Sequence, residues 1–104
     1  FYNQVGDPAL WNVTIAHNTA SGNGGGFYNL VGNPLIVNTI LFENSATAGG
    51  GIYVSNGAPA LRYNDVYNNS GGDYSGISAG ANSIAADPLF ADAAAGDYHL
   101  LDGS

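Results

Sequence analysis

Arg62 is the only arginine or lysine in a chain that also carries eight aspartate and glutamate residues. Arg62 lies beside Tyr63 and is the candidate for a catalytic residue that transfers a proton. A lone arginine is far more often a solvated side chain, and no nucleophile and base stand at a recognisable spacing. We therefore expect no catalytic residue, and we expect that the protein is not an enzyme.

Aspartates are the candidate ligands for a metal ion. The candidates are Asp65, Asp73, Asp87, Asp92 and Asp97. Calcium takes about six to eight oxygen ligands, and the spacing here matches neither an EF-hand loop nor the nonapeptide of a calcium-binding β-roll. His17 and His99 have no evident partner in the sequence. We expect no cofactor or metal, and calcium stays open as the weaker alternative to surface carboxylates that confer solubility.

Three tyrosines recur at a nearly constant interval. Tyr2, Tyr28 and Tyr53 are separated by 26 and 25 residues. If equivalent segments stack, these rings form a column on one face. Such a column stabilises the wall of a repetitive protein, and the alternative is a platform for sugar rings.

The elements that position these residues repeat with the same period. The landmarks are Gly6, Gly32 and Gly57; Pro8, Pro34 and Pro59; Asn18, Asn44 and Asn69. A period in the twenties is typical of a solenoid, and the same residue types in the same order favour parallel strands stacked in register. We predict one all-β domain, a parallel β-helix of about four coils of about 25–26 residues, approximately 1–26, 27–51, 52–76 and 77–104.

The three asparagines are predicted to form a ladder. Asn18, Asn44 and Asn69 would stack near a turn at the strand spacing of about 4.8 Å. An asparagine amide at that spacing can bond to the amides above and below it. This ladder is a structural site, not a chemical one.

One strand suggests a contact surface. Apolar residues fill both parities of the segment 35–42, whereas only one face of a strand meets the core. Either Ile36, Ile40 and Phe42 or the alternate set of Leu35, Val37 and Leu41 should face outward. We take Ile36, Ile40 and Phe42 as the candidate assembly face.

Charge and composition exclude several classes of protein. The formal net charge is −7, so phosphate backbones and anionic lipid headgroups would repel the chain. No apolar run reaches the ~20 residues that span a bilayer. Without cysteine there are no disulfides. We expect no nucleic-acid partner and no membrane insertion.

Two segments resemble known families. Phe42-Glu43-Asn44-Ser45-Ala46, followed by Gly49-Gly50-Gly51-Ile52-Tyr53, resembles the repeats of polymorphic outer-membrane and autotransporter-type surface proteins. The segments 86–90 and 96–100 are similar to the closing part of bacterial right-handed β-helix proteins of the pectate-lyase-like superfamily. The resemblance implies a right-handed coil and an exported bacterial protein, outside the cell or on its surface.

The leading functional expectation is a non-catalytic structural solenoid. The chain begins at Phe1 in mid-repeat, which predicts end-to-end self-association into a filament, or a place within a longer β-helix. The alternative is a β-helix that binds carbohydrate or resembles a polysaccharide lyase.

Overall fold

The structure, a computed structural model, describes residues 1–80, 82–92 and 95–100. Short strands joined by turns make up this part of the chain, which contains no α-helix and therefore no helix that could cross a bilayer. The strands are β1 (Tyr2–Asn3), β2 (Ala9–Trp11), β3 (Thr14–Ala16), β4 (Phe27–Asn29), β5 (Leu35–Val37), β6 (Ile40–Phe42), β7 (Ile52–Val54), β8 (Ala60–Arg62), β9 (Asp65–Tyr67), β10 (Tyr74–Ser75), β11 (Phe90–Asp92) and β12 (Asp97–Leu100).

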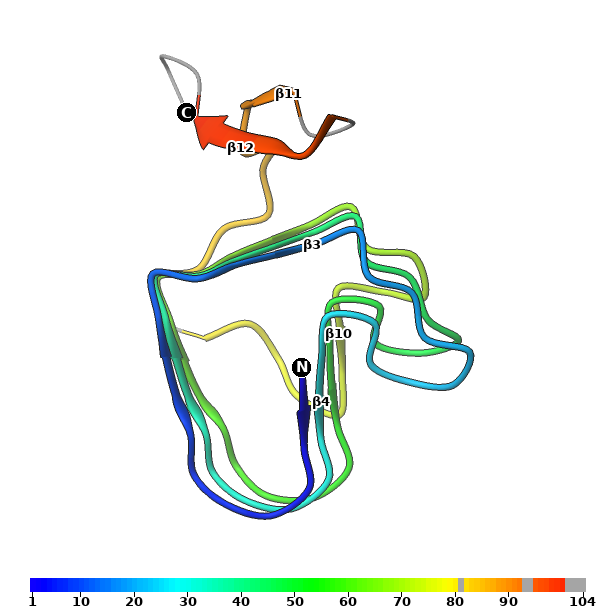
Figure 1. Cartoon of the computed structure of the whole chain (residues 1–104). Helices are drawn as coiled ribbons and strands as arrows, with labels where there is room; N and C mark the ends of the chain where they lie inside the picture. The colour runs from blue at the N-terminus through cyan, green and yellow to red at the C-terminus, as the bar shows by residue number, and fades with distance from the viewer. Residues whose placement is uncertain (81, 93–94, 101–104) are drawn as a thin grey trace.

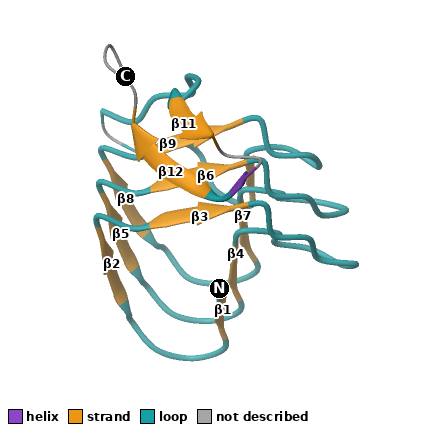
Figure 2. Ribbon diagram, turned by 45° about the horizontal axis from the view of Figure 1, so that its top comes forward, coloured by secondary structure: helices purple, strands orange, loops and turns teal. Residues whose placement is uncertain are grey.

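The first ten strands form three parallel sheets that stack along one axis. Their orders are β1-β4-β7-β10, β2-β5-β8 and β3-β6-β9. Each lap pairs with the equivalent residues of the next, as in the register Tyr2↔Tyr28↔Tyr53. The chain turns clockwise as it recedes from the viewer in Figure 1, and the laps lie one above the other in Figure 2, so the coil is right-handed. The predicted parallel β-helix is confirmed.

The core is a narrow column into which each strand packs one or two side chains. In the second lap Phe27, Ile36 and Leu41 are fully buried, and Ile52 and Val66 continue the column in the third. The strands are short because the chain must bend after about three residues to enclose so thin an interior. Burial of a large aliphatic or aromatic side chain stabilises the fold by roughly 1.5–3 kcal/mol.

Two of the bends use a residue in the left-handed backbone region. The groove corner consists of Asn12, Asn38 and Tyr63, and the ladder corner of His17, Glu43 and Asn68. All six have φ between 51° and 57°. A left-handed residue turns the strand sharply and changes which side chains face inward. Sheets β2-β5-β8 and β3-β6-β9 meet at the groove corner.

The left-handed Asn38 corrects one prediction. Ile36 is fully buried in the core, so it cannot belong to an outward assembly face. The segment 35–42 is two strands and not one, and the bend at Asn38 shifts the parity between them. Ile36 and Leu41 therefore both point inward, although a continuous strand would place them on opposite faces.

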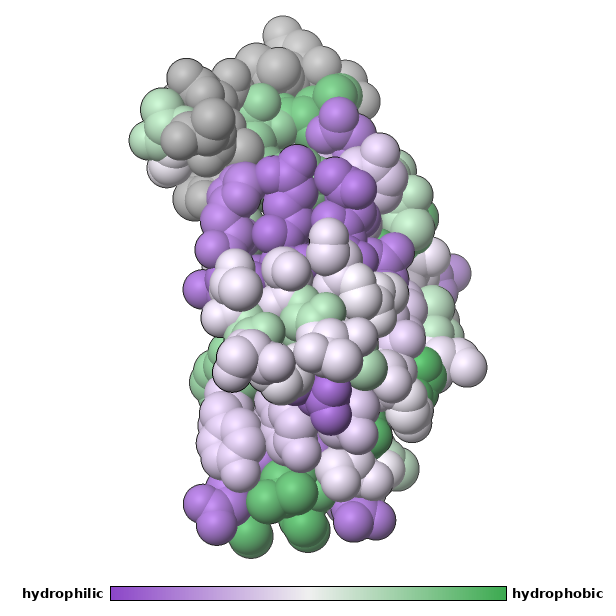
Figure 3. Space-filling view, turned by 90° about the vertical axis from the view of Figure 1, so that its right-hand side faces the viewer, coloured by the Kyte–Doolittle hydropathy of each residue, from purple (hydrophilic) through white to green (hydrophobic). Residues whose placement is uncertain are grey.

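The third connection of each lap projects as a loop on the right of Figure 1. Glycine is required where this loop returns to the stack. A Cβ on Gly25 would lie 2.6 Å from the backbone oxygen of Ser45 and 2.7 Å from that of Gly50. Figure 3 looks onto this side, whose surface is mostly neutral to hydrophilic, with apolar residues gathered at its lower end.

After the third lap the chain joins the stack briefly and then leaves it. β10 pairs with β7, and Ile84 forms a parallel bridge with Asp65. Within the predicted fourth coil, 77–104, the next described strands are β11 and β12, which pair with each other antiparallel. This hairpin lies outside the sheet β3-β6-β9 (Figures 1 and 2).

Candidate functional site

The asparagine ladder has the predicted geometry. The Oδ1 atom of Asn44 accepts bonds from the backbone nitrogen (3.0 Å) and Nδ2 (3.1 Å) of Asn18. The same two donors of Asn44 bond to Oδ1 of Asn69, at 2.8 and 3.0 Å. The carboxylate of Asp73 then replaces the next asparagine, because its Oδ1 accepts both donors of Asn69. Asn44 is fully buried and Asn69 is buried, whereas Asn18 is the exposed end of the ladder.

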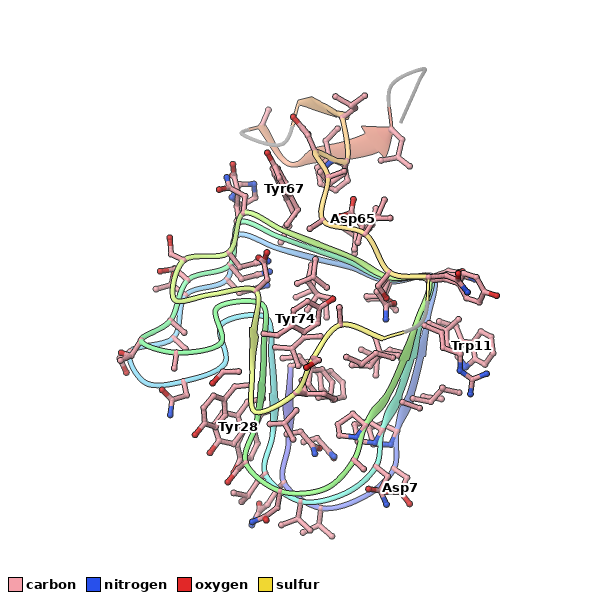
Figure 4. The ribbon with its side chains drawn as sticks, turned by 180° about the vertical axis from the view of Figure 1, so that it is seen from behind. Asp7, Trp11, Tyr28, Asp65, Tyr67 and Tyr74 are labelled. Carbon is pink, nitrogen blue, oxygen red and sulfur yellow. The ribbon has the colours of Figure 1, made fainter. Side chains whose placement is uncertain are left out.

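The tyrosine column is also present, on the outer face of the sheet that begins with β1. The centroids of Tyr2 and Tyr28 are 5.3 Å apart, and those of Tyr28 and Tyr53 are 5.1 Å apart. Both pairs are stacked, and Tyr28 lies on the outside of its strand in Figure 4. Rings that stack on each other cover much of their own faces, so this column offers a sugar little more than its end at Tyr2.

Two members of the candidate assembly face point outward, one of them covered and the other facing a groove. Phe42 is 7% exposed, because its ring stacks on Tyr67 at 5.9 Å and meets Phe90 of the hairpin edge-on at 5.4 Å. Ile40 faces a groove of about 410 Å³ between the sheet and the hairpin. The chain's own hairpin is thus the observed partner of this face.

The groove between the sheet β3-β6-β9 and the hairpin carries two carboxylates. Asp65 and Asp87 line it together with apolar side chains such as Ile84. Burial raises the pKa of Asp65 above its ordinary value, Asp73 and Asp87 add to the rise, and the bond from the Ala86 nitrogen opposes it.

No metal site is evident in the part of the chain that the structure describes. There, no three His, Asp or Glu side chains gather closely enough to hold an ion. His17 is not unpartnered as its sequence position suggested, since its Nδ1 lies 3.3 Å from Oε2 of Glu43. The side chains of Asp92, Asp97 and His99 lie outside the described part.

A groove of about 370 Å³ crosses the outer face of the sheet β2-β5-β8. It is lined by Trp11, Leu35, Val37, Asn38, Arg62 and Tyr63. Register aligns Trp11, Val37 and Arg62 along the solenoid axis. Val37 is buried beneath its neighbours, whereas Trp11 and Tyr63 are each 56% exposed. Figure 4 shows Trp11 on the outside of its strand, away from the core.

Tyr63 occupies a position where the other laps have asparagine. Asparagine tolerates the left-handed region because its short polar side chain bonds locally, and tyrosine does not. With φ of 55°, Tyr63 carries a strain of order 1–2 kcal/mol. Since most of its side chain is exposed, core packing does not account for the residue.

Arg62 brings the only arginine or lysine charge of the chain to this groove. Its guanidinium makes no hydrogen bond or ion pair with the residues that the structure describes. Five N–H donors therefore point to solvent beside two aromatic rings. Planar aromatic surface with a donor fork beside it can hold the apolar face and the oxygen atoms of a pyranose.

The sequence did not predict this groove. Arg62 was considered as a catalytic residue alone, and Trp11 was only part of a strand. The available signal was the third lap, where Arg62-Tyr63 replaces the Val37-Asn38 of the second lap and the Trp11-Asn12 of the first. Aligning the laps places these three pairs in one column.

Fold and surface together define a class, a parallel β-helix with a shallow aromatic groove on one outer sheet. Residues 3–104 match the family described as disaggregatase related, and the chain belongs to this family. Comparison with curated proteins and with solved structures gives no significant match.

Proposed function

We propose that the protein is a non-catalytic, carbohydrate-binding β-solenoid that acts outside the cell or on its surface. One observation carries the proposal. Tyr63 is held in a strained left-handed conformation with 56% of its surface exposed, next to Arg62 and in the same groove as Trp11. Strain retained in an exposed side chain supports a role in binding.

The lining of the groove favours binding over cleavage. It contains aromatic, aliphatic, amide and guanidinium groups and no carboxylate. Hydrolysis of a glycosidic bond usually needs two carboxylates on either side of that bond. A groove open along one face is also suited to a long polymer rather than to a small molecule.

The test is the affinity for a panel of soluble polysaccharides, measured by affinity electrophoresis or calorimetry. Trp11→Ala and Tyr63→Asn should each weaken binding about tenfold or more. The matched control is Tyr2→Ala, which removes a ring of similar exposure, 60%, from a different sheet.

Two outcomes would contradict binding in the groove. One is unchanged affinity in both groove variants, and the other is loss of binding only in Tyr2→Ala, which would assign the site to the tyrosine column. Release of reducing ends during incubation would show that the protein cleaves the polymer. End-to-end assembly into a filament stays a prediction, and negative-stain electron microscopy would reveal it.

A further inference from the structure

The two exposed rings of the groove stand on alternate laps. Trp11 ends β2 of the first lap, and Tyr63 follows β8 of the third. Because neighbouring strands are about 4.8 Å apart, the two positions are separated by roughly 10 Å along the axis. Tyr63 is also one residue further along its lap than Arg62, the residue in register with Val37 and Trp11. The lap between them contributes Leu35, Val37 and Asn38 and no aromatic ring.

We infer that the groove selects an extended β-1,4-linked glycan that runs parallel to the solenoid axis. This inference rests on the proposed function and names its ligand class. In such a chain successive pyranoses are turned by half a rotation, so every second sugar presents the same face. The length of that disaccharide repeat is close to the rise of two laps. Trp11 and Tyr63 therefore contact sugars n and n+2.

The lap between the rings fits the sugar that lies between them. Sugar n+1 turns its opposite face towards the protein, and its hydroxyl groups lie at the two edges of the chain. Asn38 is exposed and its side-chain amide has no hydrogen bond within the described residues, so it can bond to those hydroxyls. Val37 is small and 7% exposed, which leaves depth for the ring above it.

An α-1,4-linked glucan does not fit the same pair of rings. Its glycosidic geometry makes the polymer coil, so sugars n and n+2 neither lie on a straight line nor present the same face. A chain of this kind can contact one ring of the groove, but not both. The groove therefore discriminates by linkage more than by the identity of the sugar.

The experiment compares matched oligosaccharides by calorimetry on the intact chain. Cello-oligosaccharides of two to six units are set against malto-oligosaccharides of the same lengths. We expect the β-1,4-linked glucose hexamer to bind at least about tenfold more tightly than the α-1,4-linked glucose hexamer, since it gains one aromatic contact.

Chain length supplies the sharper readout. A β-linked trimer spans both rings and a dimer spans one, so affinity should rise about tenfold between them. In Trp11→Ala and in Tyr63→Asn the trimer should bind no better than the dimer, whereas Tyr2→Ala should retain the step.

The outcomes separate the two proposals. Equal affinity for α- and β-linked hexamers, or no step between dimer and trimer, overturns the axial β-1,4 arrangement and leaves carbohydrate binding in place. Absence of binding to every glycan tested overturns the proposed function, and this inference with it.

Discussion

The ladder corner and the groove corner are built on the same backbone and carry different side chains. At both, a residue with φ near 55° is followed by one that points inward. At the ladder corner the inward residue is asparagine in every lap. At the groove corner it is Val13, Thr39 and then Asn64. Asn64 bonds as a ladder residue does, since its Oδ1 accepts from the Thr39 nitrogen at 2.9 Å and its Nδ2 donates to the Ile36 oxygen at 2.9 Å.

The difference shows which positions the coil requires for stability and which positions can change their side chains. The ladder corner repeats because each asparagine bonds to the one in the next lap, so a single change removes hydrogen bonds to the laps on both sides. The groove corner has no such chain of bonds in its first two laps. Its outward side chains can diverge, and there the exposed rings and the arginine are found.

The largest expected effect lies at the ladder corner. Asn44→Leu should lower the free energy of unfolding by about 3 kcal/mol, because it removes the acceptor of both Asn18 donors and the bonds that Nδ2 of Asn44 donates to the Ile15 oxygen and to Oδ1 of Asn69. Urea denaturation measures the change.

Asn18→Leu is the matched control, because Asn18 is the exposed end of the same ladder and loses only one side-chain bond. Its cost should be below about 1 kcal/mol. Equal losses in the two variants would show that the ladder acts through something other than its buried bonds.

At the groove corner, a substitution should raise the free energy of unfolding instead of lowering it. Tyr63→Asn restores the residue type of the other laps and should raise the free energy of unfolding by about 1 kcal/mol, since asparagine relieves the left-handed strain. The reciprocal change, Asn38→Tyr, should lower it by a similar amount. Thermal unfolding of both variants decides the matter, and destabilisation by Tyr63→Asn would mean that the ring stabilises the fold and that its strain is no sign of function.

The features predicted from the sequence are those that recur in every lap. The period placed Asn18, Asn44 and Asn69 in one column, and in-register stacking then determined their bonds. The prediction failed at Ile36, because the side of the strand that faces the core changes at the left-handed Asn38. An asparagine in the sequence does not by itself show whether the chain continues as one strand or bends there. The groove was missed because Arg62 and Tyr63 alone resemble a loss of the repeat, and only an alignment of the laps shows that they replace Val37-Asn38 and Trp11-Asn12.

Tyr74 is a second departure from the repeat. Its side chain is destabilising because a hydroxyl is buried without a partner, whereas Tyr63 is destabilising because its backbone is strained at an exposed position. Tyr74 stands in register with Ile52, so its hydroxyl enters a column that is otherwise apolar. That hydroxyl is buried and has no hydrogen-bond partner among the described residues.

Burial, with Asp73 and Asp65 adding to it, raises the pKa of Tyr74 to about 12 from an ordinary value of 10.0. Below pH 10 both the folded and the unfolded chain hold the phenol proton, and the group does not affect the pH dependence. As the pH rises from 10 towards 12 the unfolded chain releases the proton while the folded chain retains it, so the free energy of unfolding falls.

At neutral pH, Tyr74→Phe should change the free energy of unfolding less than Asn44→Leu or Tyr63→Asn does. Removing an unpaired buried hydroxyl should raise the free energy of unfolding by less than about 1 kcal/mol. The variant should also lose part of the decline in stability between pH 10 and 12. Tyr28→Phe, at an outward position of the same sheet, is the control for both measurements. If Tyr74→Phe lowers stability at neutral pH, the hydroxyl has a partner, and the departure at the end of the stack is as structural as the ladder itself.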